Sequence, residues 1–214
     1  MLGRRRSRGS AGATPLPDPF PEPPRDELPR PQGPWDLSDV DLDDEDANRV
    51  DLGALIITSR PGMELRLQVD EKANTVVAVL LVTSGGALEL RAFAAPRNES
   101  IWDDVRRELG AEATRRGGTA TERTGDHGTE VRLVVPAQTS DGRQATQTSR
   151  IVGVAAPRWL LRGTFLGQPA AEPDSGGVLE QAFRDVIVRR GDAPMAPRSP
   201  LPLTMPPGVE PQTG

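Results

Sequence analysis

The sequence predicts an α+β fold in which a mostly antiparallel sheet, built from a duplicated β-β-β-α unit, carries two helices on one face. Three observations lead to this prediction. An octet with the pattern G-x-E-[LV]-R-L-x-V occurs twice, at residues 62–69 and 128–135. Each octet opens a series of strand-like segments that ends in a helix-like segment. Proline is concentrated at both ends of the chain and is sparse in the middle, where the elements are expected.

Proline and charge divide the chain into three parts. Residues 1–48 are expected to form a disordered arm that is first Pro-rich and then acidic, and residues 193–214 an extended Pro-rich tail. Residues 49–192 are expected to form a single α+β domain with pseudo-repeats at about 62–117 and 128–190. A chain of 214 residues with 36% hydrophobic content is long enough for one such domain.

The first repeat reads as three strands followed by a helix, after a short apolar strand at 52–57. We expect these elements at residues 63–70, 75–82, 88–93 and 101–116. The first strand alternates apolar and polar side chains, and the second is a continuous β-branched run that is typical of a central strand. Ser100 is in position to cap the helix, and Gly117 is in position to end it.

The second repeat follows the same plan with extra strands. We expect strands at 119–124, 129–135, 147–154 and 159–166, a helix that begins at Asp174 or Ser175, and a last strand at 186–190. Two helices cannot cover both faces of so wide a sheet. Both helices are therefore expected on one face, with the other face in contact with solvent.

The solvent face is the first candidate site. An acid and a base recur two residues apart on three of the expected strands, which predicts cross-strand ion pairs between neighbouring strands. Together with one more strand arginine they form a candidate interaction surface: Glu64, Arg66, Glu89, Arg91, Glu130, Arg132 and Arg162.

The acidic part of the arm is the second candidate. Seven carboxylates between Asp36 and Asp46 carry seven of the negative charges, so the rest of the chain sums to +2 (−5 + 7) and lacks the basic excess of a nucleic-acid binder. Apolar residues alternate with these carboxylates and are candidate anchors: Trp35, Leu37, Val40 and Leu42. The run is either a solvated linker or a peptide that docks on a basic surface, including the arginines of its own domain.

Cofactor and metal chemistry find little support in the sequence. Cysteine is absent, and the single histidine, His127, lies in a Gly-Asp-His-Gly stretch that is typical of a tight turn. An EF-hand reading of the acidic run fails, because Asp44 stands where a glycine is needed. We expect no cofactor. No apolar run is long enough to cross a membrane, and the early arginines are not followed by an apolar stretch, so a cytoplasmic location is expected.

Several strings resemble those of a known family. They include Gly33-Pro34-Trp35-Asp36, Ala92-Phe93-Ala94-Ala95-Pro96-Arg97, Ile101-Trp102-Asp103-Asp104-Val105-Arg106 and Pro157-Arg158-Trp159-Leu160-Leu161-Arg162-Gly163. From about Gly33 to Leu203 the chain resembles an uncharacterised actinobacterial family, domain of unknown function 3710. The resemblance implies a cytosolic actinobacterial protein. It carries no activity, so no catalytic residue is transferred.

Three functions are compatible with these features. The leading one is a non-catalytic interaction or regulatory protein that binds a protein partner, or a second copy of itself, through the charged sheet face and the arms. The second is an enzyme for a small anionic substrate held by Arg91, Arg132 and Arg162, with nearby glutamates as acid and base. The third is a nucleic-acid accessory protein, against which the nearly neutral core argues.

Overall fold

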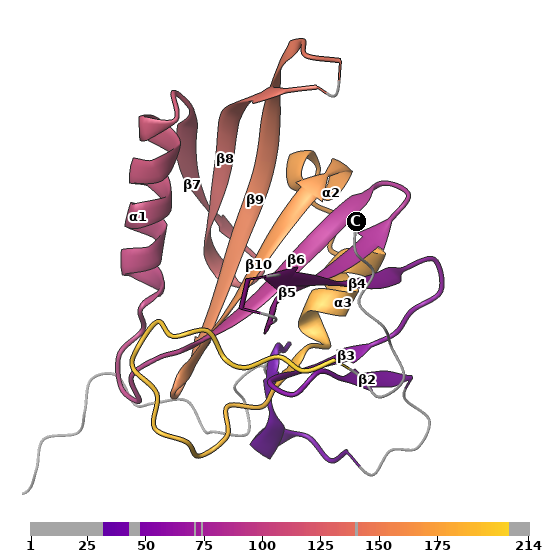
Figure 1. Ribbon diagram of the computed structural model, residues 1–214, viewed down its shortest axis with the longest axis vertical. Coiled ribbons are helices and arrows are strands. Elements are labelled where there is room, and N and C mark those ends of the chain that lie inside the picture. The colour runs from indigo at the N-terminus through magenta and orange to yellow at the C-terminus, as the bar shows by residue number, and fades with distance from the viewer. Residues whose placement is uncertain (1–31, 43–47, 71, 74, 140, 206–214) are drawn as a thin grey trace, which may run out of the picture. The chain divides into compact units, whose positions relative to one another are not determined.

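A computed structural model of the protein describes residues 32–42, 48–70, 72–73, 75–139 and 141–205. Within these residues the strands form two sheets (Figure 1). The larger one is antiparallel and has the order β4-β5-β6-β10-β9-β8-β7. Its strands are β4 (Glu64–Asp70), β5 (Thr75–Thr83), β6 (Gly86–Ala94), β7 (Thr119–Gly125), β8 (Gly128–Gln138), β9 (Gln144–Ala156) and β10 (Trp159–Gly167). The α+β class and the mostly antiparallel sheet are confirmed.

The smaller sheet has the order β1-β11-β3-β2. Its strands are β1 (Trp35–Asp36), β2 (Arg49–Asp51), β3 (Leu55–Thr58) and β11 (Ile187–Val188). β1 runs parallel to β11, whereas the other two pairs are antiparallel. β1 and the 3-10 turn η2 (Leu37–Asp39) belong to the segment 1–48 that was expected to be a disordered arm. The folded part of the chain therefore begins before residue 49.

Helix α1 (Trp102–Arg115) lies within the predicted range 101–116. Its first turn carries Asp103 and Asp104 and its last turn Arg115, charges that suit the two ends of the helix dipole. Ser100 lies one residue before the N-cap position, and its hydroxyl accepts a hydrogen bond from the Trp102 amide at 3.2 Å. The second predicted helix is α3 (Val178–Arg184), and the short helix α2 (Gln168–Ala171) before it was not predicted.

Two glycines on neighbouring strands show that α1 and α3 pack on opposite faces of the large sheet. Side chains of directly opposed residues share a face, and successive residues alternate. Gly153 is opposite Arg162, so Gly163 on the same strand as Arg162 points the other way. A Cβ on Gly153 would meet the Trp102 ring of α1, and one on Gly163 would meet the Phe183 ring of α3. We name these surfaces the α1 face and the α3 face.

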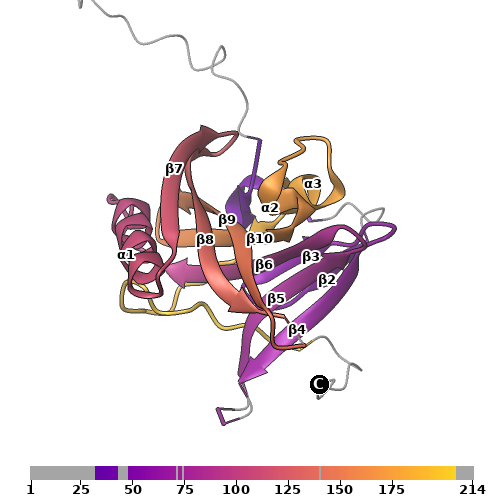
Figure 2. The same cartoon turned by 90° about the horizontal axis from the view of Figure 1, so that it is seen from above.

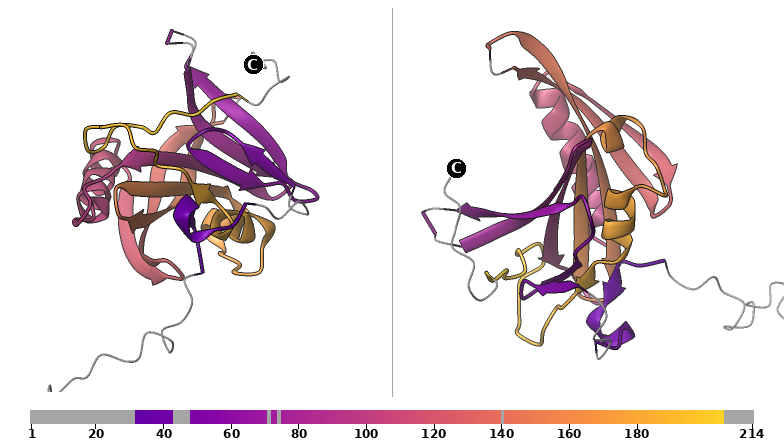
Figure 3. Two further views of the ribbon diagram at one scale, coloured as in Figure 1. Left: turned by 90° about the horizontal axis from the view of Figure 1, so that it is seen from below. Right: turned by 90° about the vertical axis from the view of Figure 1, so that its right-hand side faces the viewer.

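The prediction of both helices on one face is wrong for this reason. Figures 2 and 3 agree with the register, because they show α1 on one side of the strands β8 to β10 and the α2–α3 pair on the other. The α3 face also carries the small sheet, and these layers enclose the main apolar core, which includes Leu55, Ile57, Leu88, Leu161, Phe165 and Phe183. A second core lies under α1 and includes Trp102, Val131, Leu133, Ile151 and Leu160.

The strand order places the two predicted repeats side by side. The meanders β4-β5-β6 and β8-β9-β10 meet where β6 pairs with β10, with Arg91 directly opposite Arg162. The two octets, however, lie in unlike surroundings. Glu64 is exposed on the α1 face, whereas Glu130 is buried on the α3 face. The duplication itself stays a prediction.

The tail runs extended along the domain as far as it is described. β5 pairs with β6 only up to Leu90, and tail residues take its place beyond that point. The Leu201 amide donates to the Ala92 carbonyl at 2.9 Å, and the Ala94 amide donates to the Ser199 carbonyl at 2.8 Å. Leu201 is 3% exposed and belongs to the main core. The tail is thus an additional strand-like segment of the large sheet.

Candidate functional site

The predicted interaction surface is divided between the two faces of the sheet. The register places Glu64, Arg66, Glu89, Arg91 and Arg162 on the α1 face. It places Glu130 and Arg132 on the α3 face, because Arg132 is directly opposite Arg150, whose guanidinium lies over the Phe165 ring of the main core. The seven residues therefore form two separate surfaces.

On the α1 face the acids and bases pair within a strand. Arg66 Nε donates to Glu64 Oε1 at 2.8 Å, and this bond lowers the pKa of the Glu64 carboxyl. Arg91 donates to Glu89 in the same way, also at 2.8 Å. The predicted cross-strand ladder does not form between these two pairs, since β5 lies between β4 and β6. The exposed Arg66–Glu64 pair contributes little to stability.

A groove lies between α1 and this face of the sheet. Its volume is about 340 Å³, and five apolar residues line it: Phe93, Ile101, Val105, Leu109 and Leu160. Charged residues of α1 and the tail, Glu108, Glu112, Arg115 and Arg198, complete the lining together with Arg162 from β10. We call this hollow the α1 groove. It combines an apolar wall with a strand arginine.

Arg162 has few partners for a buried cation. Its side chain is 21% exposed, and its Nε is buried without a hydrogen-bond partner among the residues described. The nearest carboxylate is Glu89 at 3.8 Å, which already accepts hydrogen bonds from Arg91. Burial, and then the charge of Arg91, lower the pKa of the Arg162 guanidinium. A bound anion would compensate this charge.

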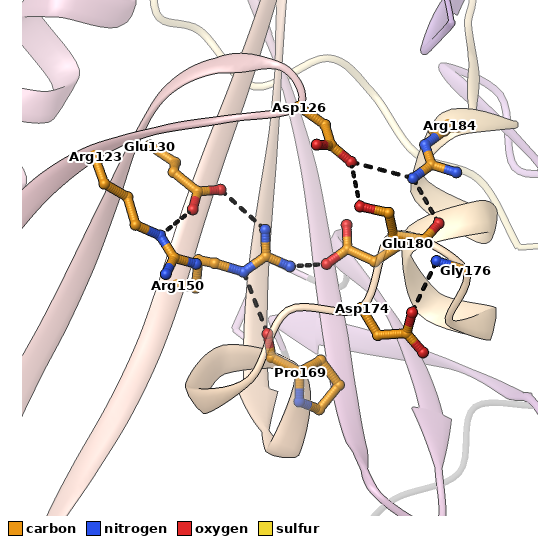
Figure 4. Close-up of polar contacts among 10 residues, drawn as sticks. Arg123, Asp126, Glu130, Arg150, Pro169, Asp174, Gly176, Glu180 and Arg184 are labelled. Carbon is orange, nitrogen blue, oxygen red and sulfur yellow. Dashed lines mark hydrogen bonds and ion pairs between the residues drawn. The ribbon is translucent and has the colours of Figure 1, made fainter.

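Glu130 belongs to a buried network on the α3 face that sequence reasoning missed (Figure 4). Arg150 donates from Nη1 to Glu130 at 2.9 Å, from Nη2 to Glu180, and from Nε to the Pro169 carbonyl at 3.2 Å. Arg123 donates to the other oxygen of Glu130. The sequence carries no clear signal for this network, because Arg150 follows Thr146 and Thr148 on its face of β9 and Glu180 lies beside the apolar stripe of α3.

A second chain of polar contacts holds the hairpin turn between β7 and β8. Asp126 accepts hydrogen bonds from the Ser175 hydroxyl at 2.7 Å and from Arg184 at 3.3 Å. The bond from Ser175 and then the charge of Arg184 lower the pKa of the Asp126 carboxyl. These contacts fix the turn residues 125–128 against the segment that leads into α3 (Figure 4).

His127 is the turn residue that the sequence predicts, and it also lines a cavity. Its ring lies edge-on to Phe183, with 5.1 Å between the ring centroids. Its Nε2 is buried and has no hydrogen-bond partner within the described part of the chain. Burial, and then the charge of Arg184, lower the pKa of the imidazole. The cavity, about 290 Å³ in volume, lies between the β7–β8 turn and α3, and we call it the α3 cavity.

The predicted anchors of the acidic arm lie away from the arginines of the α1 face. Trp35 lies in β1, and its amide donates to the Val186 carbonyl at 2.8 Å. Asp36 accepts a hydrogen bond from the Trp159 indole at 2.6 Å, on the α3-face side. The other anchors are half-buried or exposed: Leu37, Val40 and Leu42. Residues 43–47 of the acidic run lie outside the described part.

The three arginines of the enzyme hypothesis do not converge on one substrate. Arg91 and Arg162 lie on the α1 face, whereas Arg132 lies on the α3 face. Among the residues described, no group of three or more acidic or histidine side chains is placed to hold a metal ion. No helix in the same residues is long and apolar enough to cross a membrane.

The fold, the α1 groove and the α3 cavity define a class: an α+β protein with a mostly antiparallel sheet and a hollow on each face. The chain belongs to the family described as protein of unknown function, DUF3710, whose model matches residues 33–212. The predicted family is therefore confirmed, while the actinobacterial origin stays a prediction. No curated protein and no solved structure matches the chain significantly.

Proposed function

We propose that this protein is a non-catalytic binding protein of the cytosol that holds a segment of a partner protein in the α1 groove. The segment carries a carboxylate next to a large apolar side chain. The carboxylate pairs with Arg162, and the apolar side chain packs against Phe93 and Leu109. The single observation that carries this proposal is the half-buried, poorly compensated guanidinium of Arg162 in a hollow with an apolar wall.

The other charges around the groove support this assignment because they are already paired. Arg198 donates to Glu108 at 2.5 Å, and Arg115 pairs with Glu112. Neither acid is then available to neutralise Arg162. A ligand anion that reaches Arg162 forms a charge-assisted hydrogen bond in a partly dehydrated place, where such bonds are stronger than in water.

The shape of the surroundings favours a peptide over a small molecule. The sheet face next to the groove, over β4 to β6, has no helix on it within the described residues, and Glu64 and Arg66 there are exposed. An extended segment can therefore continue from the groove across these strands. Aromatic and arginine side chains are common anchors in such interfaces, and Phe93 and Arg162 supply one of each.

The test is selection from a randomised peptide display library on the immobilised full-length protein. Selected peptides are expected to carry Asp or Glu beside Leu, Ile or Phe. The best peptide, made synthetically, is then titrated into wild-type protein and variants. Removing one partner of a charge-assisted bond costs about 1.5–3 kcal/mol, so Arg162→Gln is expected to weaken binding at least about tenfold. Phe93→Ala is expected to weaken it as well.

Arg66→Gln is the matched control, since Arg66 lies on the same face but outside the groove lining. It is expected to bind the peptide like the wild type. Equal affinity of Arg162→Gln and wild type for every selected peptide would overturn the proposal. If the selected peptides lack acidic residues and bind Arg162→Gln and wild type with equal affinity, the binding surface lies elsewhere.

A further inference from the structure

The α3 cavity is independent of the α1 groove, because it lies on the other face of the sheet. It is lined by residues from the end of β7, the β7–β8 turn, β8, β9, the segment before α3, and α3 itself: Arg123, Thr124, Gly125, Asp126, His127, Glu130, Arg150, Pro173, Ser175 and Glu180. Its volume of about 290 Å³ is near the lower end of the range for ligand sites, which suits a small molecule.

Positive and negative charge are separated across this cavity. Arg123, Glu130, Arg150 and Glu180 form one chain of ion pairs that alternate in sign, so a guanidinium lies at the Arg123 end of the cavity and a carboxylate at the Glu180 end. The carboxylate of Asp126 also lines the cavity, near the Glu180 end, and it pairs with Arg184. Figure 4 shows Arg123 and Glu130 on one side and Asp126, Glu180 and Arg184 on the other.

Several polar groups at the cavity have bonding capacity left. Arg123 uses Nε for Glu130, and its two terminal nitrogens have no acceptor among the residues described. Glu180 uses Oε1 for Arg150, and Asp126 uses Oδ2 for both of its donors. The buried Nε2 of His127 has no partner within the same part of the chain. Buried polar groups in native proteins are nearly always satisfied, so the unpaired Nε2 of His127 points to a polar occupant, to which Arg123, Asp126 and Glu180 can also bond.

We propose that the α3 cavity binds a small zwitterion with an ammonium and a carboxylate group, of the class of the free amino acids. The carboxylate pairs with the terminal nitrogens of Arg123, and the ammonium is held by Asp126 and Glu180. His127 supplies a further hydrogen bond through Nε2.

Charge balance selects this class over simple ions. The three guanidinium groups and three carboxylates in and beside the cavity sum to zero, and a ligand with a net charge would disturb this balance. A zwitterion leaves the sum unchanged and aligns its two ends with the separated charges. The lowered pKa of His127, which burial causes first, keeps the imidazole neutral near pH 7 and preserves the same balance.

The test uses the full-length protein and the free amino acids as probes. Each is added at millimolar concentration in a thermal-shift screen, and calorimetry gives the affinity of any that raises Tm. At least one amino acid is expected to bind. Its Nα-acetyl derivative and its amide each lack one of the two charges, and each is expected to bind at least about tenfold more weakly.

Two variants address the two ends of the ligand separately. Arg123→Gln and Asp126→Asn are each expected to weaken binding at least about tenfold, while Arg66→Gln on the other face leaves it unchanged. Arg123 is 39% exposed and Asp126 49% exposed, so both variants are expected to fold, and circular dichroism without ligand checks this. Binding of the acetyl derivative and the amide as tightly as the parent amino acid would overturn the proposal. So would the absence of any thermal shift or heat of binding across all the amino acids.

Discussion

The guanidinium of Arg150 and the carboxylate of Glu180 form an ion pair that joins β9 to α3, and both side chains are at most 7% exposed. Buried pairs of this kind add little net stability compared with well-packed apolar residues, but they are costly to break. Arg150 also bonds to Glu130 and lies over the Phe165 ring, with its central carbon 4.0 Å from the ring centroid. The pair therefore fixes α3 and the α3 cavity against the sheet.

Removal of Arg150 is the most direct test of this network. Arg150→Met keeps much of the side-chain volume and leaves Glu180 buried without its cation. The free energy of unfolding, measured by urea denaturation, is expected to fall by about 3–5 kcal/mol. Arg107→Met removes an exposed partner of Asp104 and is expected to change it by less than about 0.5 kcal/mol. Similar losses for both variants would show that the Arg150 network is not coupled to folding.

The single histidine makes the stability depend on pH in a defined window. Burial, and then the charge of Arg184, lower the pKa of His127 below the ordinary value of 6.5. The folded protein then binds fewer protons than the unfolded chain at mildly acidic pH. The contribution of the neutral His127 to the free energy of unfolding is therefore fully present above pH 6.5, and it is lost as the pH falls below this value.

His127→Gln removes the only histidine, so it should flatten this dependence. We expect the slope of the unfolding free energy between about pH 6.5 and pH 5 to be clearly smaller in the variant than in wild type, because acidic groups titrate mostly below this window. The measurement is a series of denaturant titrations at fixed ionic strength. An unchanged slope would mean that His127 has an ordinary pKa in the folded state.

Two glycine substitutions test the close approach of α1 to the sheet. A Cβ on Gly153 would lie 2.3 Å from the Trp102 ring, so Gly153→Ala forces the helix or the strand to move and is expected to cost about 1–3 kcal/mol. Gly110 lies within α1, and a Cβ there meets only Ala120 at 3.7 Å. Gly110→Ala is expected to stabilise the protein by about 0.5–1 kcal/mol, since alanine favours a helix. Thermal or denaturant unfolding distinguishes the two signs.

Truncation tests the tail as a part of the large sheet. A chain that ends at Pro197 loses the backbone bonds to Ala92 and Ala94 and exposes the core where Leu201 packs. Loss of one buried leucine alone costs about 2–5 kcal/mol, and a comparable or larger destabilisation is expected. A chain that ends at Met205 keeps these contacts and serves as the control. Equal unfolding midpoints of the two truncated chains would contradict the assignment.

Local sequence patterns were sufficient to locate most helices and strands, but they did not show which elements pack against one another. The range 101–116 predicted for the first helix contains α1, and the strands predicted at 75–82 and 88–93 correspond to β5 and β6. The short helix α2 was missed, as was the docking of Trp35 beside β11. A strand of two residues such as β1 is too short to show a periodicity. Its pairing partner, β11, is also far away in sequence, so no local pattern indicates the pairing.

Glu64 and Glu130 occupy the same position of the two octets but have different surroundings in the fold. Their octets alone determined that both lie on strands, since alternation of apolar and polar side chains depends only on the backbone period. Which face of each strand is buried depended on where α1 and α3 pack, and this is set by long-range contacts. Glu64 consequently pairs with a solvent-exposed neighbour, whereas Glu130 lies between Arg123 and Arg150 in the interior.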